Sequence, residues 1–69
     1  MIIQVWCVYW SPKDYRNKYV ARLFENEKPT TETLVSKSYT PIKLTLQRKG
    51  LVRMERFEND DPAIKEVWL

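Results

Sequence analysis

The chain has 69 residues, a length that allows one domain near the lower limit of what folds without metals or disulfides. Its 43% hydrophobic and 13% aromatic residues argue against a disordered chain and suffice for a packed core. The net charge is +3, but basic and acidic segments alternate along the sequence. A surface for nucleic acid is typically basic throughout.

Residues 2–10 are predicted to form a strand that is apolar on both faces. β-branched and aromatic residues dominate this run, and neither glycine nor proline interrupts it. One face carries Ile3, Val5, Cys7 and Tyr9. The other face carries Ile2, Trp6, Val8 and Trp10, with Gln4 as its only polar member. Because both faces need cover from water, we expect this strand in the interior of a sheet.

The next segments predict two further strands. Residues 11–17 are polar and contain a proline, which is typical of a loop. Residues 18–25 alternate and predict a strand antiparallel to the first. Residues 26–30 predict a turn ended by Pro29. Residues 31–37 predict a third, short strand, with Thr31, Thr33 and Val35 on one face.

Residues 41–49 are predicted to form a short helix. Thr40 is suited to the N-cap, and Pro41 is tolerated in a first turn, where its missing N–H costs nothing. Gly50 follows two cations and is a good helix stop. At helical spacing Tyr39, Ile42 and Leu46 share one face, and Leu44 points away from it. Residues 42–46 also alternate, so a strand remains the alternative for this segment.

The remaining residues predict two more strands, over residues 51–57 and 63–69, joined by a turn at 58–62. In the last strand Ala63, Val67 and Leu69 share one side, and Ile64 and Trp68 share the other. A cross-strand ion pair of Glu66 with Arg53 or Arg56 would hold the register. The order β-β-(β)-α-β-β predicts a single α+β domain over residues 1–69, with an antiparallel sheet of four to five strands and one short helix on a face.

Residues 50–69 resemble the ending of small uncharacterised bacterial proteins. In those proteins a Gly-Leu pair, a basic strand and an Asp-Asp-Pro turn precede a closing Glu-hydrophobic-Trp. The matching residues here are Gly50, Leu51, Arg53, Arg56, Asp60, Asp61, Pro62, Ile64, Glu66 and Trp68. The resemblance implies a bacterial or phage source and a helix before Gly50, and it implies no activity.

Residue types that carry catalysis are mostly absent from the sequence. There is no histidine, which removes the commonest general base and zinc ligand, and one glycine cannot build a phosphate-binding loop. Acidic residues at 58–61 are better explained by turn chemistry than by a cation site. We therefore expect a non-enzymatic protein with no cofactor and no metal.

The cysteine content points to a reducing compartment. Cys7 is the single cysteine, so no disulfide can form within the chain, and its apolar neighbours predict a buried, inert thiol. The first strand lacks a basic flank and is too short to span a bilayer, and charges interrupt the rest of the chain. We expect neither a signal peptide nor a transmembrane helix, and a cytoplasmic location.

The leading hypothesis for function is protein association, because one short helix cannot cover the predicted sheet. A helix of about nine residues is about 13 Å long and narrower than a sheet of four or five strands at about 4.8 Å each. We therefore expect the remaining apolar face, or an edge strand, to bind another protein, most simply a second copy. The expected interface anchors are Trp6, Trp10 and Trp68, because tryptophan dominates interface energies.

The charge alternates in sign along the chain, which fits attraction within the fold or between copies. Residues 13–22 carry +3, residues 25–32 carry −2, residues 37–56 carry +5 and residues 58–66 carry −3. Segments of opposite charge attract one another within a fold or between two copies of it.

The alternative hypothesis is a nucleic-acid-binding module. Exposed aromatic residues that stack on bases beside phosphate-binding cations are typical of such modules. The candidate residues are Tyr15, Arg16, Lys18, Arg48, Lys49 and Arg53. Buried aromatic residues and ordinary surface charges explain the same residues more simply, so we favour protein association.

Overall fold

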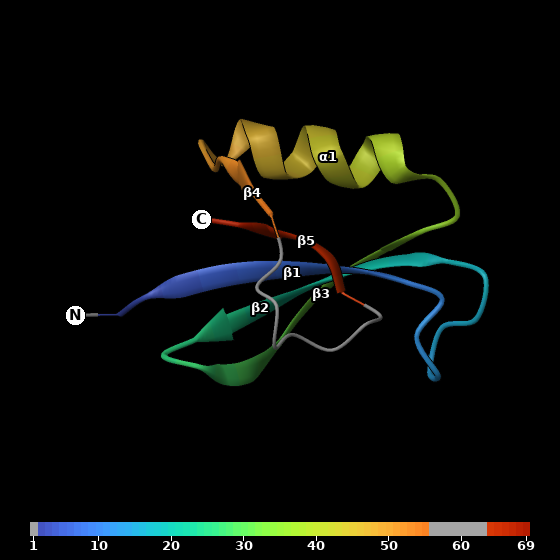
Figure 1. The fold of residues 1–69 in the computed structure, drawn as a ribbon, viewed down its shortest axis with the longest axis horizontal. Helices are drawn as coiled ribbons and strands as arrows, with labels where there is room; N and C mark the ends of the chain where they lie inside the picture. Colours follow the sequence, from blue (N-terminus) through green and yellow to red (C-terminus); the bar gives the residue numbers. More distant parts are fainter. Residues whose placement is uncertain (1, 56–63) are drawn as a thin grey trace.

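The computed structural model describes residues 2–55 and 64–69, which form an antiparallel sheet of five strands and one helix (Figure 1). The elements are β1 (Gln4–Trp10), β2 (Tyr19–Glu25), β3 (Lys28–Ser36), α1 (Tyr39–Arg48), β4 (Arg53–Met54) and β5 (Ile64–Trp68). This order confirms the predicted α+β fold, including the third strand and the helix that precedes Gly50.

Strand β1 lies at the centre of the sheet, as its two apolar faces predict. The strand order is β3-β2-β1-β5-β4, so β1 pairs with β2 on one side and with β5 on the other. The ladder with β2 is regular from Gln4 opposite Glu25 to Trp10 opposite Tyr19. The first and the last strand along the chain are therefore neighbours in the sheet.

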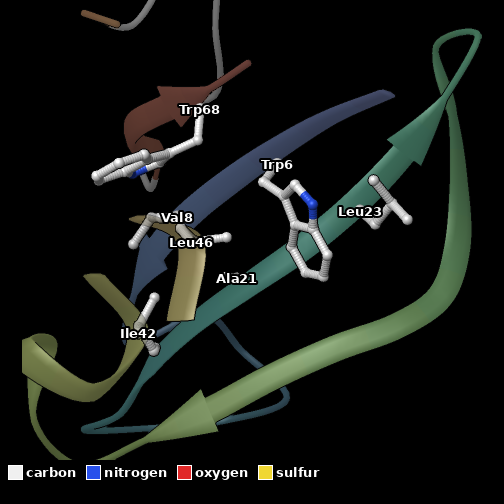
Figure 2. Close-up of a cluster of buried hydrophobic side chains, with 7 residues drawn as sticks. All are labelled: Trp6, Val8, Ala21, Leu23, Ile42, Leu46 and Trp68. Carbon is white, nitrogen blue, oxygen red and sulfur yellow. The ribbon is translucent and has the colours of Figure 1, made fainter. Parts of the chain in front are cut away.

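Helix α1 covers one face of the sheet, here called the closed face (Figure 1). A buried cluster joins the two, with side chains from β1, β2, β5 and α1 pointing into one space (Figure 2). Its members are Trp6, Val8, Ala21, Leu23, Ile42, Leu46 and Trp68. The alternate residues of the same strands point to the other side, here called the open face. By register they include Val5, Cys7, Tyr9, Val20, Arg22, Phe24 and Val67.

Helix α1 begins earlier than predicted. Its N-cap is Ser38, in extended conformation with φ −115° and ψ 149°, and the predicted cap Thr40 lies inside the first turn. Pro41 is also inside that turn, where the first four N–H groups have no helical acceptor, so the proline removes no hydrogen bond. The predicted inner face is correct, because Ile42 and Leu46 are buried and Leu44 is exposed.

Helix α1 ends at Arg48, one residue earlier than predicted, and Gly50 is the predicted helix stop. Gly50 has φ +80° and its N–H donates to the carbonyl of Gln47 over 2.9 Å. The N–H of Leu51 reaches the carbonyl of Leu46 over 3.4 Å, which completes a Schellman motif. Leu51 then packs against the buried cluster. The motif fixes both the end of α1 and the direction in which the chain returns to the sheet.

The turn between β2 and β3 is shorter than predicted. It consists of Asn26 and Glu27, with φ of 50° and 69°, values typical of a type I′ hairpin turn. Pro29 does not end a turn but lies inside β3. It is tolerated there because β3 is an edge strand, where one row of backbone groups needs no partner in the sheet.

A β-bulge overturns the predicted sidedness of β5. Val8 pairs with Glu66 but Tyr9 pairs with Ile64, so Lys65 is an extra residue between them. Ile64 therefore lies on the open face and Trp68 on the closed face, although their spacing predicts one side. The predicted strand over 51–57 is confirmed for Arg53–Met54, and residues 56–63, with the predicted turn at 58–62, lie outside the described residues.

Candidate functional site

The open face carries an apolar hollow of about 610 Å³. It is lined by Ile3, Val5, Cys7, Tyr9, Phe24, Asn26, Glu27 and Ile64. Among residues 2–55 and 64–69, no helix lies on this side of the sheet, because α1 is on the other (Figure 1). The hollow is therefore a depression in the surface of the sheet itself.

Ile3 is the most exposed apolar side chain of the hollow, at 59%. Its position is fixed by Asn26, whose Oδ1 accepts from the N–H of Ile3 over 3.0 Å. The N–H of Asn26 in turn donates to the carbonyl of Ile3 over 2.9 Å. Two reciprocal bonds thus hold the backbone of Ile3 beside Asn26, at the end of β1.

Cys7 is half-buried on the open face, in contrast to the predicted buried thiol. The reason is its position in β1, since odd-numbered residues of this strand point away from α1. Val5, Tyr9 and Phe24 beside it are also half-buried.

The loop between β1 and β2 is fastened to one end of the open face. The guanidinium group of Arg22 forms an ion pair with Asp14 of this loop and lies 5.7 Å from the ring centre of Tyr9. Within the loop, Ser11 Oγ accepts from the N–H of Asn17 over 3.0 Å. The loop is thus held by specific polar contacts, and the guanidinium group of Arg22 is paired with Asp14.

The two ends of the open face differ in charge. The β1–β2 loop carries Lys13, Arg16 and Lys18 against Asp14. The β2–β3 turn carries Glu27, which lines the hollow, whereas Glu25 and Glu32 lie on the closed-face side. These two connections lie at opposite ends of the sheet (Figure 1). The open face therefore has a basic loop at one end and the carboxylate of Glu27 at the other.

The structure separates the three tryptophans expected at an interface. Trp6 and Trp68 are 4% and 2% exposed and lie beneath α1, so in this conformation they contribute to the core and not to a surface (Figure 2). Trp10 is 39% exposed and lies at the end of β1, on the closed-face side. These residues were predicted as interface anchors from their residue type alone. Their positions in β1 and β5 place none of the three on the open face.

The structure also separates the residues of the nucleic-acid hypothesis. Tyr15, Arg16 and Lys18 lie in or beside the β1–β2 loop, whereas Arg48 and Lys49 lie at the far end of α1 (Figure 1). The Nζ of Lys49 is 5.5 Å from the ring centre of Trp6. Because the cations are divided between opposite ends, the described residues do not bring these candidates together in one basic surface.

Glu66 is the buried charged residue of the closed face, at 8% exposed. Its Oε1 accepts from the hydroxyl of Tyr39 and, over 2.9 Å, from Nε1 of Trp68. Arg53 Nη1 lies 3.6 Å from Oε2, which confirms the predicted cross-strand pair with Arg53, while Arg56 is outside the described residues. Burial, then the hydrogen bond to Glu66 and its charge, raise the pKa of Tyr39 to about 12.

The described residues contain no group of three or more His, Cys, Asp and Glu side chains that could hold a metal ion. None of the helices formed by these residues has the length and apolar character to cross a membrane. Comparison with known proteins adds no assignment, because no family model, curated protein or solved structure matches this chain.

Proposed function

We propose that this is a non-enzymatic interaction protein that forms a homodimer, in which the open faces of two copies pack against each other. The observation that carries the proposal is the apolar hollow on the side of the sheet opposite α1. Apolar surface gathered in one patch and left in water is a common mark of a protein interface.

Charge complementarity supports a second copy as the occupant. In a face-to-face pair, a two-fold axis running across the strands places the acidic β2–β3 turn of one copy against the basic β1–β2 loop of the other. A two-fold axis along the strands would bring like charges together, which opposes that arrangement. An isologous dimer then makes the favourable contact twice.

Exposed Ile3 supplies a driving force for association. Complete burial of an isoleucine side chain contributes roughly 1.5–3 kcal/mol, and Ile3 still exposes more than half of its surface at 59%. Cover by a second copy would gain about 1 kcal/mol for this residue in each copy. Residues of the hollow such as Phe24 and Tyr9 add to this gain.

Light scattering on Ile3→Lys tests the proposal. The wild-type chain is expected to have twice the monomer mass, and Ile3→Lys the monomer mass, because a charge in the interface would lose its water. Leu44→Lys is the matched control, since Leu44 is a 45% exposed apolar residue on the outer side of α1. A wild-type monomer, or equal effects of the two variants, would contradict the proposal.

Charge reversal tests the orientation of the pair. Glu27→Arg and Arg16→Glu are each expected to weaken the dimer, because each places like charges opposite one another. The double variant restores the attraction with the signs exchanged, so its affinity should return toward that of the wild type. Equal additive losses in the double variant would overturn the two-fold arrangement across the strands.

A nucleic-acid role has less support, because its candidate residues lie at opposite ends of the molecule (Figure 1). It makes a distinct prediction, which is oligonucleotide binding that weakens steeply with salt. Binding of this kind by both the wild type and the Ile3→Lys monomer would favour the alternative.

We also propose a cytoplasmic protein of bacterial or phage origin. The support is the single cysteine, which fits a reducing compartment, and the resemblance of residues 50–69 to the ends of small bacterial proteins. Fractionation of cells that express a tagged chain tests the location, and recovery in an oxidising compartment would contradict it.

A further inference from the structure

A second depression, on the closed-face side of the sheet, has a different character from the hollow. It has a volume of about 330 Å³ and is lined by Val8, Trp10, Tyr19, Tyr39, Lys65 and Glu66. Three of these six residues are aromatic and come from three elements, namely β1, β2 and α1. We call this depression the aromatic cleft.

The three rings are packed at angles to one another. The ring centres of Trp10 and Tyr19 are 4.7 Å apart with an interplanar angle of 48°. Those of Tyr19 and Tyr39 are 5.6 Å apart at 58°. The rings are therefore tilted and do not stack face to face, and Tyr19 and Tyr39 are only partly buried. Trp10, at 39% exposed, is the most open of the three to solvent.

Glu66 adds a negative charge to the wall of the aromatic cleft. Its Oε1 is already used by Tyr39 and Trp68. Arg53 Nη1 forms an ion pair with Oε2 over 3.6 Å, and 64% of the Arg53 side chain is exposed, so water screens this cation more than the buried carboxylate. The pKa of Tyr39 is raised to about 12, so its hydroxyl is protonated at neutral pH and donates to the carboxylate. The cleft thus combines π-faces with a carboxylate that has little access to water.

We infer that the aromatic cleft binds an organic cation of the methylated-ammonium type, either as a free small molecule or on a lysine side chain of a peptide. A quaternary ammonium group has an apolar surface that fits aromatic walls, and its charge is attracted by ring faces and by the carboxylate of Glu66. The same pairing of cation and ring occurs twice elsewhere in the protein, between Arg22 and Tyr9 and between Lys49 and Trp6.

Lys65 opposes a cation and makes the electrostatic argument testable in both directions. It lines the cleft next to Glu66 in sequence, but its side chain is exposed and can turn into solvent. Removing its charge should therefore strengthen cation binding, whereas removing the charge of Glu66 should weaken it. A cleft that binds ligands through apolar contact alone would respond to neither change.

The first experiment compares choline with 3,3-dimethylbutanol, which has the same shape and no charge. The probe signal is the indole N–H resonance of Trp10, with the buried indoles of Trp6 and Trp68 as internal references. Choline is expected to shift the Trp10 signal saturably and to bind about tenfold more tightly than the neutral compound. Equal affinity for the two compounds, or no shift at all, would overturn the inference.

Four variants locate the site. Trp10→Ala should abolish the affinity difference between choline and the neutral compound. Because this variant lacks the indole probe, its binding is measured by calorimetry. Tyr15→Ala is the control, since Tyr15 is an exposed aromatic residue outside the cleft. Glu66→Gln keeps an oxygen acceptor for Tyr39 and should lower choline affinity, while Lys65→Gln should raise it. If Glu66→Gln does not fold, the Trp10 and Lys65 variants still decide the outcome.

Two further experiments ask whether the cation is a free molecule or part of a peptide, and whether binding requires the dimer. A peptide with trimethyl-lysine that binds more tightly than both choline and the same peptide with unmodified lysine would identify a protein ligand; otherwise the ligand is a free cation. The cleft lies on the side opposite the hollow, so the Ile3→Lys monomer should bind choline as the wild type does. Loss of binding in that monomer would contradict a site complete within one chain.

Discussion

The two faces of β1 are similar in composition and differ in cover. On the closed face, Trp6 and Val8 are buried beneath α1. On the open face, Val5, Cys7 and Tyr9 come from the same seven-residue strand and are only half-buried. Hydrophobicity therefore places residues in the sheet, whereas the position of α1 decides which face of β1 is buried by a helix. Among the described residues the open face is covered only in part, since Val20, Val67 and Ile64 are buried and Val5, Cys7 and Tyr9 are not.

Truncation on the closed face should produce the largest effect. Leu46 is fully buried in the cluster beneath α1, and Leu46→Ala is expected to cost about 2–5 kcal/mol through lost burial and the remaining cavity. A domain of this size has a total stability of roughly 3–10 kcal/mol, so urea denaturation should show a large fall in midpoint or an unfolded chain. Val5→Ala on the open face should cost much less in a monomeric background; equal costs would contradict the difference in cover.

A substitution at Gly50, after the C-terminal end of α1, should have a smaller effect on stability. Gly50 has φ +80°, and an added Cβ would meet nothing within 4 Å, so Gly50→Ala suffers from backbone strain alone. We expect a loss of about 1–2 kcal/mol in the free energy of unfolding. Gly50→Asn is the matched variant, since asparagine tolerates this conformation better and should lose less. Equal losses would show that the Schellman motif is not the cause.

The polar contact between α1 and β5 should contribute less again. Tyr39→Phe removes the hydroxyl that donates to Glu66 and should cost about 0.5–1.5 kcal/mol. The pKa of Tyr39 is raised from 10.0 to about 12 in the folded chain, so the folded state holds this proton more tightly. Its contribution to stability is complete below pH 10 and should be lost as the pH rises through about 12.

Absorbance of tyrosinate against pH measures this directly. One tyrosine should titrate near pH 12 in the wild type, and that late step should be missing in Tyr39→Phe. Unfolding measured from pH 10 upward should show a smaller decline in the variant. A late step that persists in Tyr39→Phe would assign the raised pKa to another residue.

The smallest effect is expected on the open face. Asp14→Asn breaks the ion pair with Arg22, both partners of which are partly exposed, and should change stability by less than about 1 kcal/mol. Hydrogen exchange in the β1–β2 loop should nonetheless become faster, because the pair fastens the loop to Arg22. Unchanged exchange would show that the bonds of Ser11 and Asn17 hold the loop without it.

Local rules predicted most of the fold. The two-sided apolar pattern of residues 2–10 placed β1 at the centre, and Gly50 placed the end of α1. The rules failed where tertiary context decided the outcome. Pro29 is accepted in β3 because that strand is at an edge, and the bulge at Lys65 reverses the side of Ile64.

The candidate site was only partly predictable. The pattern indicated an uncovered face, yet the expected anchors were chosen as tryptophans, and two of the three fill the core. Strand parity separates Ile3, Val5 and Tyr9 from Trp6 and Trp10, but the sequence does not say which of the two faces α1 covers. The aromatic cleft had no signal in the sequence, because the bulge and the β-hairpin bring Glu66 beside Trp10 and Tyr19.

The most direct test of the open-face dimer is isotope-filtered NMR on a mixture of labelled and unlabelled chains. Contacts between copies are expected at Ile3, Val5 and Phe24, and none at Leu44 or Leu46, which belong to α1. Contacts confined to residues of β3 would indicate pairing through the sheet edge. Their absence in a dimer of wild-type mass, or their location on α1, would contradict the claim that the open face is completed by a second copy.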